Sequence, residues 1–161
     1  MARSLVAALV ADVEERYAGD GEPDDPEAEW ALAVDDVTPP RGVFLVAYLD
    51  GWAVGCGALR PFPGAGPGVA EVKRMYTSPS ARRRSVSRAV LARLESDAAG
   101  FGYRRLLLQT GLRQPEAMAL YAASGYHRIP NFGAWAASEL TACFAKDLPR
   151  GSAAADGVGA R

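Results

Sequence analysis

A run of arginines and serines near the middle of the chain carries its clearest potential chemistry. Arg82, Arg83 and Arg84 are followed by Ser85, Val86, Ser87 and Arg88. They separate a predicted strand from a predicted helix. The first turn of a helix presents unpaired N–H groups and the positive end of the helix dipole, which together suit phosphate. Cations are unfavourable there, so three arginines indicate a bound polyphosphate; a solvated helix start capped by serine is the plainer alternative.

The remaining sequence supplies elements that could position this loop. Asp50-Gly51 separates two β-rich runs, and both central residues of such a hairpin turn need positive φ. Pro115 suits the first position of a helix, and Gly125 follows its end. We expect helices at 2–18, 86–98 and 115–123, and strands at 42–49, 52–59, 69–77, 103–110, 126–129 and 139–144. This order predicts an α/β fold in which a mixed sheet has helices on both faces.

Composition places the chain among ordinary globular domains. Its 161 residues are 49% hydrophobic and 23% charged, which excludes a wholly disordered chain, a collagen-like repeat and a disulfide-stapled miniprotein. Its longest apolar runs, Leu5–Ala11 and Val43–Leu49, hold seven residues each, whereas a membrane span takes about 20. Cys56 and Cys143 have neither metal-binding spacing nor a disulfide framework. We therefore expect a cytoplasmic protein with reduced cysteines, no bound metal and no membrane contact.

Charge is segregated along the chain. Residues 1–36 hold eleven acids and two arginines, whereas residues 37–161 hold sixteen lysines and arginines and eight acids. This division predicts partners of both signs, or else two solvated faces that attract one another. A pI of about 5.9 and an acidic first quarter are atypical of a nucleic-acid-binding protein.

Two motifs resemble the GNAT superfamily of N-acetyltransferases. The family signature for acetyl-CoA, Q/R-x-x-G-x-G/A at the start of a helix, falls on Arg82–Ser87. The stretch from Gln114 to Tyr126 is similar to the family's N-x-x-A-x-x-L-Y-x-x-x-G-F/Y, with Gln114 in place of the usual asparagine. The order of elements from residue 42 to 148 also agrees. The resemblance implies a GNAT-like fold with a mostly antiparallel sheet over residues 1–148, followed by a flexible tail at 149–161.

Two departures from the family pattern stand out. Ser85 and Ser87 occupy the positions of the loop glycines, which let backbone amides approach the pyrophosphate closely. Serine keeps the N–H but adds a Cβ, and a positive φ at Ser85 costs on the order of 1 kcal/mol. The family also begins with a strand before its first helix, whereas this chain begins with the helix.

The resemblance also implies roles in amide formation. The oxyanion needs a preorganised hydrogen-bond donor. In the family this donor is a backbone N–H on the strand before the phosphate loop, which corresponds to Met75 or Thr77 in this sequence. Tyr121 lies where the family often places the acid that protonates the leaving thiolate, although it could equally be a core aromatic. Glu71 matches the base that deprotonates the amine, often through water; the alternative is a strand-edge carboxylate paired to Lys73 or Arg74. The implied acetyl-CoA-binding residues are Met75, Tyr76, Thr77, Arg82, Arg83, Arg84, Ser85, Val86, Ser87, Arg88, Gln114, Met118 and Tyr121.

The implied reaction moves an acetyl group from acetyl-CoA to the amine of a small molecule by direct attack in a ternary complex. The acidic N-terminal quarter predicts a cationic or neutral amine. Trp30, Trp52 and Trp135 could line the acceptor pocket or belong to the core, and His127 is expected at the surface or packed on a strand. The alternative function is a non-catalytic GNAT-like module that binds CoA or another protein. The sequence leaves the oligomeric state open, a homodimer included.

Overall fold

The computed structural model describes residues 2–18 and 32–149. Three α-helices are defined in these ranges: α1 (Ala2–Tyr17), α3 (Val86–Gly100) and α4 (Pro115–Ala123). The strands are β1 (Val43–Leu49), β2 (Trp52–Pro61), β3 (Val69–Thr77), β4 (Arg105–Gly111), β5 (His127–Ile129) and β6 (Thr141–Asp147). Of these, β3 and α4 have the bounds expected from the sequence. The predicted tail from residue 150 onward and Trp30 lie outside the described residues.

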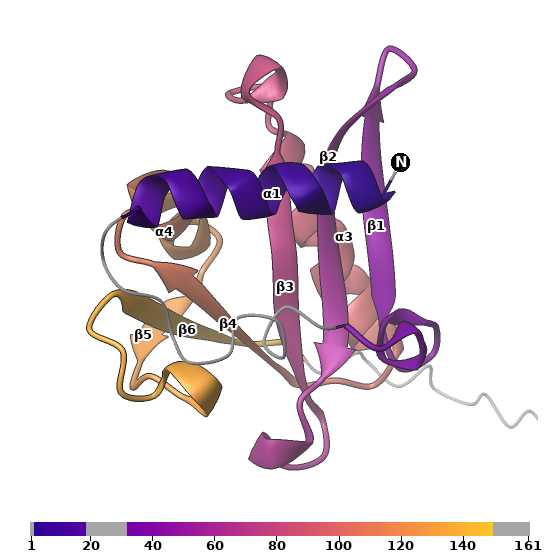
Figure 1. Ribbon diagram of the computed structural model, residues 1–161. Coiled ribbons are helices and arrows are strands. Elements are labelled where there is room, and N and C mark those ends of the chain that lie inside the picture. Colours follow the sequence, from indigo (N-terminus) through magenta and orange to yellow (C-terminus); the bar gives the residue numbers. More distant parts are fainter. Residues whose placement is uncertain (1, 19–31, 150–161) are drawn as a thin grey trace, which may run out of the picture.

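The six strands form one mixed sheet in the order β1-β2-β3-β4-β6-β5. Only the β3–β4 pair is parallel, and the other four pairs are antiparallel. Helix α1 lies across one face of the sheet, and α3 and α4 lie on the other (Figure 1). The predicted mixed, mostly antiparallel sheet with helices on both faces is therefore confirmed.

The main core lies between the sheet and helices α3 and α4. Leu91 and Leu94 of α3 are almost fully buried against alternate residues of the central strands, including Val72 and Leu106. A smaller cluster on the opposite face centres on Val69, Leu107 and Ala145, with Phe62 and Phe132 packed against it. Two-sided burial explains the continuous apolar run Leu106–Leu108 in β4.

The β1–β2 hairpin turns at the predicted residues. Asp50 has a φ of 51° and Gly51 a φ of 82°, as a two-residue hairpin turn requires. Trp52, which follows the turn, is 77% exposed. The expectation that Trp52 could belong to the core is therefore wrong, because the residue lies beside the exposed turn of the hairpin.

Strand β6 extends three residues beyond the predicted end at residue 144. The sequence does not predict this extension, because Lys146 and Asp147 are charged. In the structure both residues have ion-pair partners. Lys146 Nζ lies 2.7 Å from Glu95 Oε2, and Arg105 Nη1 lies 3.1 Å from Asp147 Oδ1. These pairs hold charged residues in the sheet opposite β4. No helix among the described residues combines the length and apolar character needed to cross a bilayer.

Candidate active site

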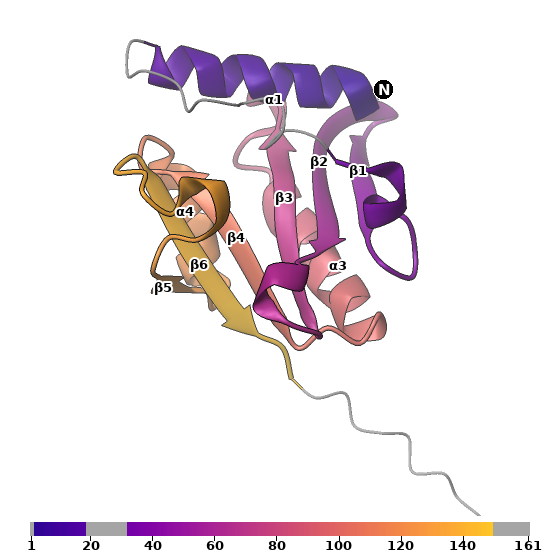
Figure 2. The same cartoon turned by 60° about the horizontal axis from the view of Figure 1, so that its bottom comes forward.

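The parallel pair β3–β4 opens at the end that leads into the arginine-serine loop. Among the described residues, pairing between the two strands is limited to Val69–Val72 with Arg105–Leu108. Beyond these positions the strands diverge toward the end that α1 crosses (Figures 1 and 2). The second half of β3, the loop that follows it and the start of α4 therefore lie at the end of the sheet where β3 and β4 no longer pair with each other, which we call the opening.

A β-bulge turns β3 at this point. Cys56 of β2 pairs with Tyr76, but Ala58 pairs with Lys73, so two residues of β3, Arg74 and Met75, lie opposite Gly57. Arg74 has a left-handed φ of 58°. A bulge disrupts the ladder locally. Met75, one of the two expected oxyanion donors, lies in this bulge, whereas Thr77, the other, is in register with Gly55 of β2.

The loop after β3 has two non-glycine residues in the left-handed region. Arg83 has a φ of 65° and Ser85 a φ of 61°. Ser85 is the N-cap of α3 but makes no side-chain capping hydrogen bond. No backbone carbonyl of the described residues accepts a hydrogen bond from the amides of residues 83–88. Together with the helix dipole, these amides are suited to bind an anion.

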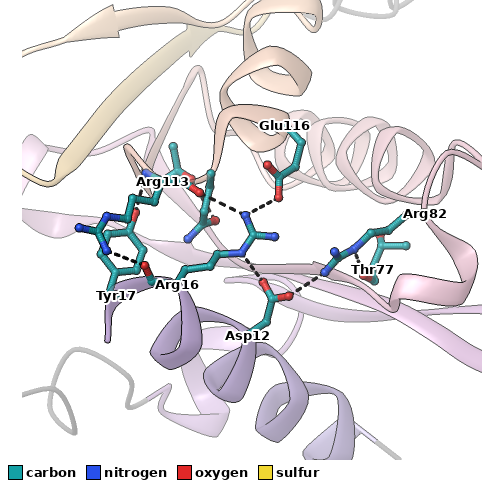
Figure 3. Close-up of polar contacts among 9 residues, drawn as sticks. Asp12, Arg16, Tyr17, Thr77, Arg82, Arg113 and Glu116 are labelled. Atoms are coloured by element: carbon teal, nitrogen blue, oxygen red, sulfur yellow. Dashed lines mark hydrogen bonds and ion pairs between the residues drawn. The ribbon is translucent and has the colours of Figure 1, made fainter. Parts of the chain in front are cut away.

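The arginines of the loop are not equivalent. Arg83, Arg84 and Arg88 are exposed. Arg82 is bound by its neighbours instead: its Nη2 lies 2.7 Å from Asp12 Oδ1 of α1, and its Nε donates to the Thr77 carbonyl at 3.4 Å (Figure 3). The loop therefore offers three exposed guanidinium groups and one that is already paired.

Helix α1 joins the two sides of the opening through ion pairs. Arg16 Nε lies 2.9 Å from Asp12 Oδ2, and Arg16 Nη1 lies 2.6 Å from Glu116 Oε1 in the first turn of α4. The Tyr17 hydroxyl accepts a hydrogen bond from the Arg113 amide at 2.9 Å (Figure 3). The sequence alone does not indicate this network, because only the Asp12–Arg16 spacing of four residues on a helix predicts any part of it.

Glu71 lies on the face of the sheet opposite α3 and is 1% exposed. Its Oε2 accepts hydrogen bonds from Arg60 Nε at 2.8 Å and Arg60 Nη2 at 2.7 Å, and its Oε1 lies 3.8 Å from Lys73 Nζ. Lys73 was an expected partner of Glu71. Arg60, which lies opposite Glu71 in the β2–β3 register, was not expected.

Tyr121 is 4% exposed and packs in the main core. Its ring lies 5.9 Å from that of Tyr126 and 6.0 Å from that of Phe144. Burial raises the pKa of Tyr121 above its ordinary value, so the phenol keeps its proton at neutral pH. These contacts are those of a core aromatic, and the raised pKa makes the phenol a weaker proton donor than an exposed tyrosine.

The remaining expected donor-site residues lie near the opening. Gln114 is the N-cap of α4, and its side-chain oxygen accepts a hydrogen bond from Thr110 Oγ1 at 3.4 Å. Met118 packs on the main core one helical turn further on. Burial raises the pKa of Tyr76, and Thr77 Oγ1 is buried without a partner among the described residues. His127 is exposed on β5.

The sequence matches the family model "Acetyltransferase (GNAT) family" over residues 7–126. An "IAA acetyltransferase" of Azospirillum brasilense is 37% identical over 146 residues, which are 89% of this chain and 93% of that protein. Among solved structures, a candidate acyl-CoA N-acyltransferase of Klebsiella pneumoniae is 28% identical, with a TM-score of 0.69 over 91% of this chain and 88% of the other. The PaiA N-acetyltransferase of Thermoplasma acidophilum, solved with coenzyme A, is 18% identical, with a TM-score of 0.56 over 66% of this chain and 61% of the other.

Proposed function

Because the chain belongs to the GNAT family of acetyltransferases, we propose that it is an acetyl-CoA-dependent N-acetyltransferase that acts on a small amine. The observation that carries this proposal is the loop between β3 and α3. Its amides at residues 83–88 have no backbone acceptor among the described residues, and Arg83, Arg84 and Arg88 are exposed around them. This combination fits a pyrophosphate, which needs several N–H donors and positive charge.

The opening beside the loop suits the rest of the donor. Residues 75–77 of β3 have no pairing with β4, so this edge offers backbone groups to an extended ligand that contains amides. When bound, the donor supplies an activated acetyl thioester. We assign its binding to Met75, Tyr76, Thr77, Arg82, Arg83, Arg84, Ser85, Val86, Ser87, Arg88, Gln114, Met118 and Tyr121.

The chemistry requires an oxyanion donor, a base and an acid. We assign the oxyanion donor to a backbone N–H at Met75 or Thr77, since preorganised amides stabilise developing negative charge without reorganisation. Tyr121 is assigned as the acid from its place in the family motif; its core packing and its raised pKa, which makes the phenol a weaker proton donor, support a purely structural role as the alternative. Glu71 is assigned as the base, acting through water; its pairing with Arg60 and Lys73 supports a purely structural role as the alternative.

The acceptor is proposed to be a cationic or neutral amine. The support for this assignment is the acidic character of residues 1–36, because a site of one sign concentrates ligands of the other. A panel of polyamines, amino acids and aminoglycosides should be acetylated in preference to acidic peptides. Preference for the acidic peptides would refute this assignment.

Calorimetry with CoA and acetyl-CoA is the first test. At 100 times its dissociation constant a ligand stabilises the folded state by about 2.7 kcal/mol, so a parallel thermal scan should show a clear upward shift. Thiol release from acetyl-CoA can then be followed with a thiol reagent, since both cysteines of this chain are buried. Binding without thiol release for any amine would favour the non-catalytic CoA-binding module, and no binding at all would reject the donor assignment.

A further inference from the structure

One carboxylate of α1 holds an arginine of the proposed donor loop. Asp12 accepts from Arg82 Nη2 on one oxygen, at 2.7 Å, and from Arg16 Nε on the other, at 2.9 Å (Figure 3). Asp12 and Arg82 are seventy positions apart in the sequence. The position of α1 and the position of the loop are therefore linked through a single side chain.

This pair is partly withdrawn from water. The side chain of Asp12 is 27% exposed and that of Arg82 is 39% exposed. Burial raises the pKa of Asp12, but hydrogen bonds and charges from Arg82 and Arg16 outweigh burial and leave the pKa below its ordinary value. Asp12 is consequently negatively charged at neutral pH, directly beside a loop that is suited to anions.

A second tie fixes the same helix to the other side of the opening. Arg16 Nη1 bonds Glu116 Oε1 at 2.6 Å and the Arg113 carbonyl at 3.2 Å, and Arg113 Nη1 donates to the Arg16 carbonyl at 2.8 Å. The last turns of α1 thus bridge the loop after β3 and the start of α4. They cross the face of the sheet on which Glu71 lies.

We propose that Asp12 is a latch that competes with the donor's phosphates for Arg82. The inference rests on the proposed function and adds a regulatory contact to the same site. A pyrophosphate bound to the amides of residues 83–88 brings negative charge next to Arg82, and this charge repels the Asp12 carboxylate while it attracts the same guanidinium. Donor binding therefore weakens the Asp12–Arg82 pair and so loosens one of the two contacts that hold the last turns of α1 in place.

Asp12→Asn tests the latch with little change of shape, because asparagine can still accept a hydrogen bond from Arg82. Removing the competing charge should tighten CoA binding about two- to fivefold, the range that corresponds to a partly exposed ion pair. The matched control is Glu15→Gln, which removes the same charge from an exposed position of the same helix. This control should bind CoA as the wild type does, because Glu15 is not the carboxylate on Arg82.

A second readout separates a latch from a merely structural contact. Asp12→Asn should lower the melting temperature of the ligand-free protein and raise CoA affinity, whereas loss of a structural contact lowers both. Weaker or unchanged CoA binding in the variant, with clear binding in the wild type, overturns the latch and leaves the proposed function intact. Binding by the variant alone supports a latch held closed. No CoA binding by either protein rejects the proposed function and the latch together.

Discussion

The left-handed backbone at Ser85 predicts that replacing this serine with glycine stabilises the folded protein. With a φ of 61° and a ψ of 15°, a residue that has a Cβ pays about 1–2 kcal/mol relative to glycine. Ser85→Gly removes this strain. Glycine also raises the conformational entropy of the unfolded chain, which lowers the stability of the folded state by about 0.4–1 kcal/mol. The serine makes no side-chain capping hydrogen bond, so none is lost. We expect a net stabilisation of about 0.5–1 kcal/mol.

Ser87→Gly is the matched control, since it makes the same chemical change two residues later. Ser87 lies in the first turn of α3 and does not have a positive φ. Glycine there should destabilise the protein by about 0.5 kcal/mol through its low helix propensity. The two variants should therefore differ in melting temperature by about 2–6 °C, given roughly 2–4 °C per kcal/mol for a chain of this size.

Chemical denaturation and calorimetry with CoA should be run on both variants. Ser85→Gly should also tighten CoA binding, because the backbone is more accessible without the Cβ. Arg83→Gly relieves a second left-handed residue, at a φ of 65°, but removes a cation; it should stabilise the fold and weaken CoA binding. If Ser85→Gly destabilises as much as Ser87→Gly, Ser85 is not in the left-handed region and the reasoning about this loop is wrong.

Four further outcomes are expected. Tyr121→Phe should lower turnover by about 10²–10⁴-fold with little change in CoA affinity, and unchanged turnover would leave Tyr121 only its role in the core. Glu71→Gln should abolish the acid limb of the pH–rate profile and, by leaving Arg60 without its carboxylate partner, lower stability by about 3 kcal/mol; an intact limb would assign the base elsewhere. Because the pKa of Asp12 is lowered in the folded protein, its charge stabilises the fold at a pH above the ordinary aspartate pKa of about 3.9. This stabilisation is lost as the pH falls through the pKa of Asp12 in the folded state, so the denaturation curves of wild type and Asp12→Asn should converge in acid. Burial raises the pKa of Cys56 to about 11, so iodoacetamide at pH 8 should label Cys56 only after unfolding; rapid labelling of the native protein would contradict its burial.

Local sequence signals were sufficient for most of the fold. The Asp50-Gly51 turn, the bounds of β3 and those of α4 follow from turn residues, a β-rich run and a proline at a helix start. Local signals did not predict the end of β6, because Lys146 and Asp147 are charged residues typical of a loop when their ion-pair partners are not known. Short-range patterns describe an element well when its stability is local, and poorly when it depends on charges brought by another element.

The same limit governs the site. The loop at 82–88 could be located from its arginines and the following helix, since strand, loop and helix are consecutive in the chain. Arg60 could not be assigned to Glu71, because that contact depends on the β2–β3 register across the intervening loop. The pairing of Asp12 with Arg82 depends on how α1 crosses the sheet, which no local pattern in either segment indicates.

The short β3–β4 ladder has a consequence for hydrogen exchange. A sheet normally has two edges with unpaired backbone groups, and here the divergence after Val72 and Leu108 creates two more inside the sheet, one on β3 and one on β4. Amides of residues 75–77 that face β4 should exchange with deuterium quickly, whereas residues 69–72 of the same strand, which pair with β4, should exchange slowly. Mass spectrometry of peptides from β3 should therefore show two exchange regimes within one nine-residue strand, and a ligand that occupies the inner edge of β3 should merge them into one.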